Sequence, residues 1–409
     1  MRLLRKHILT TLVCIAVQGL SCPDSPAQEK SSGWGIKAAA NRMTIGSFRD
    51  TYTSTGFNSF SMEFDYVTGP SGEKGGYAES FNYPVLGIGL TYNTLSDVIF
   101  KSPRGHYSDM LALYGKISRD LIRTRHIGFG YDVSLGLSYS SKYYNPLDNP
   151  SNWFFSAPIL FYVAGGGHLT WMVTPKLDIE AEINVRHNSS ARFAYPNGGL
   201  NYWGGGLAAR YRLKERSAPK GSVFRAGLFL GDHNKKGWSR EIYFGGGIHA
   251  CAAEWLAFTK TETVETQAAT RLKRWPMASL SADLIYRTGG KFAAGFTLDG
   301  FWNSNTERLR WADSVLYSEE ENEASKGYAP FSAGVGIVQE VFYNNIALYI
   351  QEGVYLYRRM GIHGEHGWLY ERAGLRYYPE ALKPFFFSVC IKAHKFKADY
   401  MDFSFGVKF

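Results

Sequence analysis

Large apolar residues alternate with small or polar residues without a break from residue 127 to residue 139, and this period of two predicts a β-strand. Glycine, serine and aspartate form one face, and the other face carries Ile127, Phe129, Tyr131, Val133, Leu135, Leu137 and Tyr139. The apolar face suits hydrocarbon, whereas the other face suits water or a packed polar interior. The pattern therefore favours a sheet with one side facing lipid.

The same alternation returns along the chain, at residues 86–93 and at 401–409. A chain that ends on a strand with a terminal Phe409 resembles bacterial outer-membrane barrels, whose last strand is read by the assembly machinery. Further candidate strands lie near 32–41, 57–66, 107–117, 157–172, 176–189, 200–213, 222–231, 240–250, 272–287, 292–302, 330–342, 346–357, 366–377 and 384–394. Because single-chain bacterial barrels favour even numbers, we expect about sixteen strands, within a range of fourteen to eighteen.

Composition separates a membrane barrel from a soluble β-sandwich, which also alternates. Aromatic residues make up 16% of the chain and there are 44 glycines, as in barrels with aromatic girdles and crowded, curved sheets. A sandwich would expose polar faces, but here one face of nearly every strand is large and apolar. We therefore expect an all-β fold, a transmembrane antiparallel β-barrel in the bacterial outer membrane.

The first residues predict export. A basic start precedes an apolar centre at residues 8–17 and small residues before Gln28, which is the pattern of a secretory signal peptide, here 1–27, cut after Ala27. A lipoprotein signal ending at Cys22 is the alternative. Residues 28–409 are then expected to form a single outer-membrane barrel.

Cysteine content and charge narrow the class further. Only Cys251 and Cys390 remain after the signal, too few for a disulfide scaffold, although one bridge is possible. No later segment has about 18 consecutive apolar residues, so no membrane-spanning helix is expected. The net charge of +9 is compatible with binding to anionic headgroups or phosphates but does not identify a partner. We do not expect a nucleic acid as a binding partner.

Three polar residues interrupt the lipid-facing pattern of one predicted hairpin. The apolar phase of residues 176–189, followed two positions at a time, reaches His187 and Ser189. The apolar phase of residues 200–213, followed backward in the same way, reaches Asn201. A base, a nucleophile and an orienting group thus share the outward face near the hairpin tip.

Polar groups on a lipid face cost free energy, and a substrate that is itself a lipid would explain them, because its ester would never leave the membrane. The alternative is that the strand has left the hydrocarbon by His187, so that these are ordinary interfacial or loop residues. An H-x-S pattern alone does not decide between them.

The stretch HNSSARFAYPNGGLN, residues 187–201, resembles the motif of the outer-membrane lipid A 3-O-deacylases, also called the acyloxyacyl hydrolase family. That motif runs H-x-S-N, a short loop, then P-N-x-G-x-E or P-N-x-G-x-N. The resemblance implies that His187 is the catalytic base, Ser189 the nucleophile and Asn201 the third member. The closing KAHKFKADYMDFSFGVKF and the stretch GWLYERAGLRYY are also similar to longer family members.

Two positions depart from the motif. Ser190 replaces an asparagine and Arg192 replaces a glycine, both of which help hold the oxyanion in the family. The Ser190 hydroxyl and the Arg192 side chain are therefore the candidate substitutes. Asn201 can orient the imidazole but cannot neutralise its positive charge as a carboxylate would.

The resemblance implies a serine esterase that acts on lipid A of lipopolysaccharide at the 3-position, without a cofactor. A non-enzymatic barrel, meaning a porin, a channel or a structural protein, is the alternative, because sixteen strands can enclose an aqueous lumen. No metal site is expected from His233, His249, His363 or His366. Calcium at exposed carboxylates, such as those of the acidic loop expected at 318–327, stays open.

Overall fold

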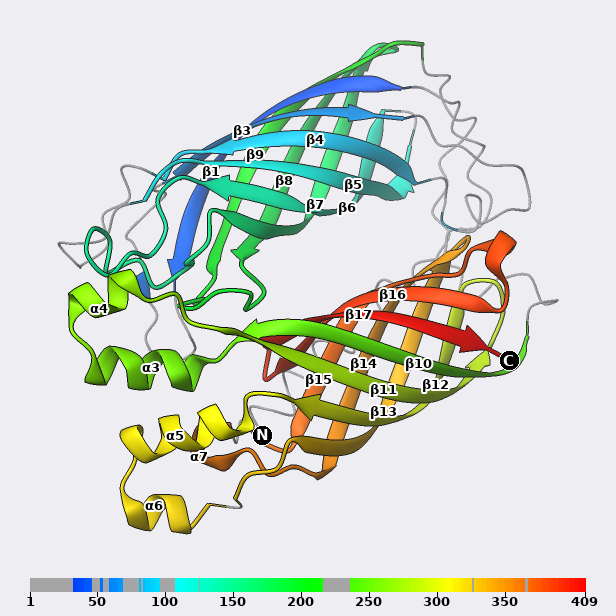
Figure 1. The fold of residues 1–409 in the computed structure, drawn as a ribbon. Helices are drawn as coiled ribbons and strands as arrows, with labels where there is room; N and C mark the ends of the chain where they lie inside the picture. Colours follow the sequence, from blue (N-terminus) through cyan, green and yellow to red (C-terminus); the bar gives the residue numbers. More distant parts are fainter. Residues whose placement is uncertain are drawn as a thin grey trace. The chain divides into compact units, whose positions relative to one another are not determined.

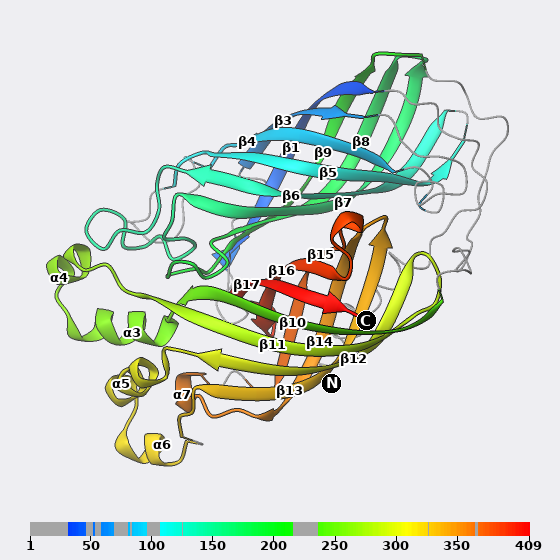
Figure 2. The same ribbon diagram turned by 45° about the vertical axis from the view of Figure 1, so that its right-hand side comes forward.

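The computed structural model describes residues 32–45, 52–53, 59–68, 81, 84–95, 107–124, 126–215, 236–325, 327–364 and 367–409. The expected signal peptide and the candidate strand at 222–231 lie outside these residues. The chain forms two compact units (Figures 1 and 2), each described by itself below. The first consists of Met1–Lys142, Pro158–Asn188 and Gly198–Asp232, and the second of Tyr143–Ala157, Ser189–Asn197 and His233–Phe409.

Eight antiparallel strands close into a barrel in the first unit. Each pairs with its neighbour in sequence, and β1 also pairs with β9, which joins the two ends of the sheet. The short β2 (Tyr52–Thr53) extends one edge of β1. The barrel strands are β1 (Gly33–Ile45), β3 (Ser59–Val67), β4 (Val85–Asn93), β5 (Met110–Arg123), β6 (Ile127–Ser140), β7 (Ile159–Thr174), β8 (Leu177–Ser189) and β9 (Leu200–Arg212).

The second unit contains another closed antiparallel barrel, in which β10 pairs with both β11 and β17. Its strands are β10 (Gly237–Ala250), β11 (Arg274–Arg287), β12 (Phe292–Asn303), β13 (Phe331–Tyr343), β14 (Ile346–Tyr357), β15 (Leu369–Tyr377), β16 (Phe385–His394) and β17 (Lys397–Lys408).

The described residues confirm the all-β, antiparallel barrel architecture, with sixteen barrel strands in total. The closure differs from the single barrel that we expected, because the strands form two rings of eight. The alternation of a strand reports which face is apolar, but it does not report which strand is its partner. The register between β1 and β9, which runs from Gly33 opposite Arg212 to Thr44 opposite Asn201, closes the first ring.

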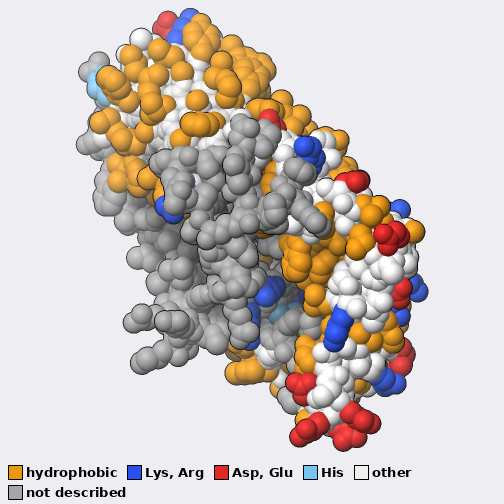
Figure 3. All heavy atoms as spheres, turned by 90° about the vertical axis from the view of Figure 1, so that its left-hand side faces the viewer, with side chains coloured by type: hydrophobic (Ala, Val, Ile, Leu, Met, Phe, Trp, Pro, Cys, Tyr) orange, Lys and Arg blue, Asp and Glu red, His pale blue; other side chains and the backbone are white. Residues whose placement is uncertain are grey.

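The outer faces carry the apolar phase that the sequence predicts. On β8, Ile183 and Val185 are 71% and 61% exposed, and Phe403 and Phe405 on β17 are also exposed. Figure 3 shows such side chains gathered over the outside of the strands. No helix among the described residues is long and apolar enough to cross a membrane.

The interior of the first barrel is filled by ion pairs. Glu63 accepts from the Lys37 ammonium at 2.8 Å and from the Tyr114 hydroxyl at 2.8 Å, and it also pairs with Arg186. All four side chains are buried. The inside of an eight-stranded barrel is just wide enough for side chains to fill, so the polar phase of these strands packs against itself.

The second barrel repeats this arrangement around fully buried arginines. Arg376 pairs with Glu241 at 3.0 Å, with Asp283 at 2.8 Å and with Glu340 at 2.8 Å. Arg372 bridges Asp299 and Asp402. These charges are buried with partners, as a closed interior requires.

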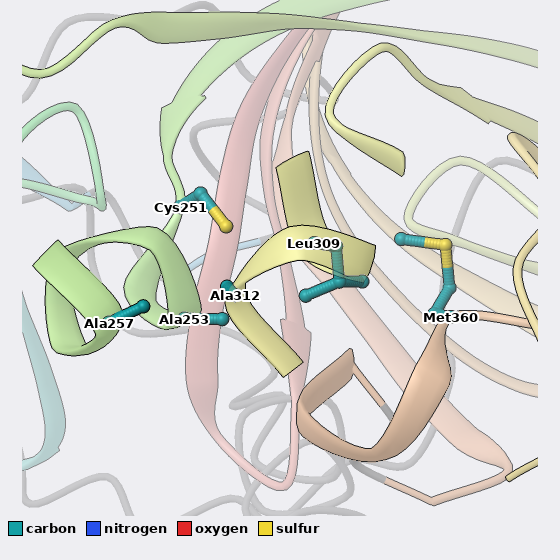
Figure 4. Close-up of a cluster of buried hydrophobic side chains, with 6 residues drawn as sticks. All are labelled: Cys251, Ala253, Ala257, Leu309, Ala312 and Met360. Carbon is teal, nitrogen blue, oxygen red and sulfur yellow. The ribbon is translucent and has the colours of Figure 1, made fainter. Parts of the chain in front are cut away.

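Helices occupy one end of the second barrel, in connections between strands (Figure 1). The alternation did not predict them, and the acidic segment expected as a loop contains α6, which begins with a capping box between Ser318 and Glu321. The helices are α3 (Ala252–Thr261), α4 (Val264–Ala269), α5 (Thr306–Leu316), α6 (Glu319–Glu323) and α7 (Gly361–Gly364), with a 3-10 helix, η2 (Glu380–Leu382), in the connection between β15 and β16. Cys251, Ala253, Ala257, Leu309, Ala312 and Met360 form their apolar core (Figure 4).

Candidate active site on the β8–β9 hairpin

His187 and Asn201 lie directly opposite each other near the tip of the β8–β9 hairpin. The His187 Nδ1 atom lies 2.7 Å from the Asn201 Oδ1 atom. His187 shares the phase of the exposed Val185, and Asn201 shares that of the exposed Trp203. Both side chains therefore stand on the outward face, because side chains two residues apart lie on the same side of a strand.

The contact between His187 and Asn201 determines which imidazole nitrogen carries the proton. An amide oxygen only accepts hydrogen bonds, so Nδ1 must be the donor in this pair. The Nε2 atom of neutral His187 then keeps its lone pair. This is the state that a general base needs.

Ser189 is the last residue of β8 and follows His187 by two positions, so the alternation of a strand assigns both to one face. Its side chain is buried. The backbone N–H of Ala191 approaches the Ser189 Oγ atom at 3.5 Å. In that contact Oγ is the acceptor, so the hydroxyl proton remains available to a base.

The loop after Ser189 is held by Ser190 and Asn197. The backbone N–H and the hydroxyl of Ser190 each contact Asn197 Oδ1 at 2.9 Å, and the hydroxyl also lies 3.0 Å from the Ala194 carbonyl. The Ser190 hydroxyl, an oxyanion candidate by sequence, is thus engaged inside the loop. Because Oδ1 faces Ser190, the Asn197 amide points its NH₂ group elsewhere. Only the Pro196-Asn197 match in the motif gave a sign of this residue's importance.

Arg192 keeps the backbone conformation that a glycine would adopt. Its φ is +67° and that of Ala191 is +45°, in the left-handed region where side chains other than glycine are uncommon. The Arg192 guanidinium donates to the Ala398 carbonyl at 3.3 Å. The side chain is therefore partly engaged away from Ser189, whereas the backbone retains the shape of the motif.

Gly199 lies against the His187 ring. Its φ is +71°, and a Cβ atom built there would lie 2.8 Å from His187 Cε1, closer than real contacts allow. Gly199 thus permits both the turn and the close packing of the imidazole. The sequence offered Gly199 only as part of the motif and gave no sign of this contact.

Acidic side chains inside the first barrel come close enough to hold a cation. Oxygens of Asp132, Glu180 and Glu182 lie within 4.8 Å of one another. However, Lys37 pairs with Glu182 at 2.7 Å, and Lys116 lies 3.6 Å from Asp132. Asp132 and Glu182 thus belong to the interior ion-pair network. Among the candidate histidines, His233, His366 and the His363 side chain lie outside the described residues.

A closed ring of antiparallel strands with an apolar outer face and a polar interior is the architecture of outer-membrane β-barrels, and this chain is a bacterial outer-membrane barrel protein. Residues 238–409 match the family model described as acyloxyacyl hydrolase, C-terminal domain. This part of the chain is therefore similar to the C-terminal domain of the acyloxyacyl hydrolases. This match spans the strands of the second barrel, and the β8–β9 hairpin lies outside it.

Solved structures of outer-membrane barrels give weak similarity. Neisserial surface protein A is 10% identical, with a TM-score of 0.29 over 44% of this chain and 96% of that one. The outer membrane enzyme PagL is 11% identical, with a TM-score of 0.25 over 44% and 98%. The Pseudomonas putida toluene transporter TodX is 9% identical, with a TM-score of 0.16 over 93% and 88%. No match is found among curated proteins. Values this low carry no argument about function.

Proposed function

We propose that the protein is an outer-membrane serine esterase that removes an ester-linked acyl chain from lipid A of lipopolysaccharide. The acyloxyacyl hydrolase domain at residues 238–409 supports a hydrolase. The position of His187 and Asn201 on the lipid-facing side of β8 and β9 supports a substrate that lies in the membrane. The ester at the 3-position is implied by the motif resemblance.

In the proposed reaction, Ser189 Oγ attacks the acyl carbonyl while His187 Nε2 accepts the hydroxyl proton. The tetrahedral intermediate collapses to an acyl-serine ester, and the imidazolium returns the proton to the leaving sugar oxygen. Water, deprotonated by the same imidazole, then releases the fatty acid and restores the serine. Asn201 holds the His187 ring in the orientation that both steps need.

Two groups in the loop support the oxyanion. The left-handed backbone at Arg192 retains the conformation of the motif glycine, so its N–H is one proposed donor. The Asn197 NH₂ group, directed away from Ser190 by the contacts of its oxygen, is the other. Loss of one such donor typically lowers the rate by about 100- to 1000-fold.

The observation that carries the proposal is the 2.7 Å contact between His187 Nδ1 and Asn201 Oδ1. It leaves a basic nitrogen on His187, two positions before Ser189 along β8. The channel alternative depends on a wide lumen, and both barrels have only eight strands and interiors filled with ion pairs. The structure thus supports an enzyme better than a pore.

Mass spectrometry of lipid A after incubation of lipopolysaccharide with the purified, refolded protein tests the proposal. Wild type should release a hydroxy fatty acid, and Ser189→Ala and His187→Ala should each abolish the release. Ser141→Ala and His126→Ala, at exposed positions outside the hairpin, are matched controls. Equal release by wild type and both hairpin variants would rule out this nucleophile and base.

A further inference from the structure

A small polar cavity lies at the helical end of the second barrel. Its volume is about 40 Å³, room for roughly three water molecules, which is also the scale of one tetrahedral oxyanion. One wall is apolar and comes from the helix core, with Cys251, Leu309 and Met360 (Figure 4). The remaining lining is mostly polar, with side chains from β10, β13, β14, β16 and β17.

The charge of this lining is positive. Arg192, Arg358 and Lys392 face one carboxylate, that of Asp399. The Lys392 ammonium lies 2.8 Å from Asp399, so this pair is neutral overall. Among the described residues, neither Arg192 nor Arg358 forms an ion pair with a carboxylate, and Arg358 lies over the Tyr355 ring at 5.0 Å. Two guanidinium charges therefore remain without a counter-charge in the described part of the chain.

Hydrogen-bonding groups in the lining also remain unused. Asn305 and Ser332 are 3% and 4% exposed. Asn305 Oδ1, Ser332 Oγ and Arg192 Nε are buried and have no hydrogen-bond partner among the described residues. Buried polar atoms without partners are costly, and several around one cavity indicate a ligand or ordered water that supplies the missing bonds.

The other end of the Asn305 amide is fixed. Its Nδ2 atom lies 3.2 Å from His249 Nε2, and His249 Nδ1 lies 3.3 Å from the Asp399 carbonyl. An amide nitrogen donates and a carbonyl accepts, so His249 is neutral and carries its proton on Nδ1. Asn305 Oδ1 is therefore an acceptor, and a ligand would need a hydrogen-bond donor to contact it. The Ser332 hydroxyl and the Arg192 guanidinium are donors.

We propose that this cavity binds the phosphate group of a phosphomonoester or of free inorganic phosphate. Such a group carries two charges for Arg192 and Arg358 and several acceptor oxygens for guanidinium and serine donors. In its doubly charged form, inorganic phosphate still carries one protonated oxygen, which supplies the donor that Asn305 Oδ1 lacks, whereas a phosphomonoester carries this proton only in its singly charged form. The cavity shares Arg192 with the loop of the β8–β9 hairpin but uses its guanidinium, not its backbone N–H, and the inference does not rest on the proposed esterase activity.

Isothermal titration calorimetry of the folded protein in a zwitterionic detergent, with inorganic phosphate as the probe, tests this site. Wild type should bind phosphate saturably. Arg358→Gln should weaken the affinity by about 10-fold or more, the scale of a lost charge-assisted bond, and Ser332→Ala by a few-fold. Arg359→Gln is the matched control, because Arg359 is exposed and is not part of the lining.

A second titration, with a monophosphorylated glucosamine lipid and its dephosphorylated form, identifies the source of the phosphate. Competition by the phosphorylated lipid alone indicates a lipid headgroup, whereas binding of inorganic phosphate without such competition indicates the free anion; either supports the site. Absence of saturable phosphate binding overturns the proposal. An equal loss in Arg358→Gln and Arg359→Gln, or no loss in Arg358→Gln and Ser332→Ala, also overturns it. Gel mobility before and after heating verifies that each variant is folded.

Discussion

Replacing Gly199 with alanine tests whether the His187 ring position is catalytic. The added Cβ atom would lie 2.8 Å from His187 Cε1, and ordinary contact begins at 3.4 Å. The ring must therefore move by about 0.6 Å (3.4 − 2.8), or the turn must open. A displacement of 1 Å at a reacting group costs about 100-fold in rate, so we expect Gly199→Ala to lower deacylation by about 10- to 100-fold.

The same substitution also strains the backbone, and this effect needs a control. Alanine at the left-handed φ of +71° costs about 1–2 kcal/mol of stability. Gly327→Ala is matched, because Gly327 has φ +77° and nothing lies within 4 Å of its added Cβ. Both variants should lose similar stability in urea unfolding in detergent micelles, and only Gly199→Ala should lose activity.

The assay is single-turnover release of fatty acid from lipopolysaccharide at matched folded fractions. If Gly199→Ala reacts at the rate of Gly327→Ala and wild type, the imidazole does not act from the position seen here. The assignment of His187 as the base would then be refuted, whatever the stability of the two variants.

Two further substitutions follow from the contacts. Asn201→Asp keeps an acceptor at the same position and adds a negative charge beside the imidazole, so its deacylation rate should equal or exceed that of wild type. Asn201→Ala should be about 10- to 100-fold slower, because it loses one orienting hydrogen bond. Equal rates for all three proteins would show that Asn201 has no role in the reaction. Arg376→Met leaves the buried carboxylates of Asp283 and Glu340 without their cation and Glu241 with Lys408 alone, and it should destabilise the protein by about 3–5 kcal/mol in urea unfolding. The exposed pair of Arg310 with Glu307 provides the control, since Arg310→Met should change unfolding little; an equal effect would contradict the role given to the buried network.

The part of the site that the sequence predicted is the part that alternation controls. His187, Ser189 and Asn201 continue the lipid-facing phase of two strands, and these strands are consecutive in the chain, as neighbours in an antiparallel sheet commonly are. The contacts of Asn197 and Gly199 were not predictable in this way. They depend on left-handed loop residues, which no period of two describes.

The sequence by itself determined the strands, their apolar faces and the barrel class, because the alternation of side chains across a strand is a local steric property. Tertiary structure decided that the strands close as two rings of eight, through the pairing of β1 with β9 and of β10 with β17. It also brought Arg376 to three carboxylates from three strands, and it assembled the phosphate-sized cavity from residues as distant as Arg192 and Asp399. Such sets form only when closure fixes which strands are neighbours, and a one-dimensional pattern carries no record of that choice.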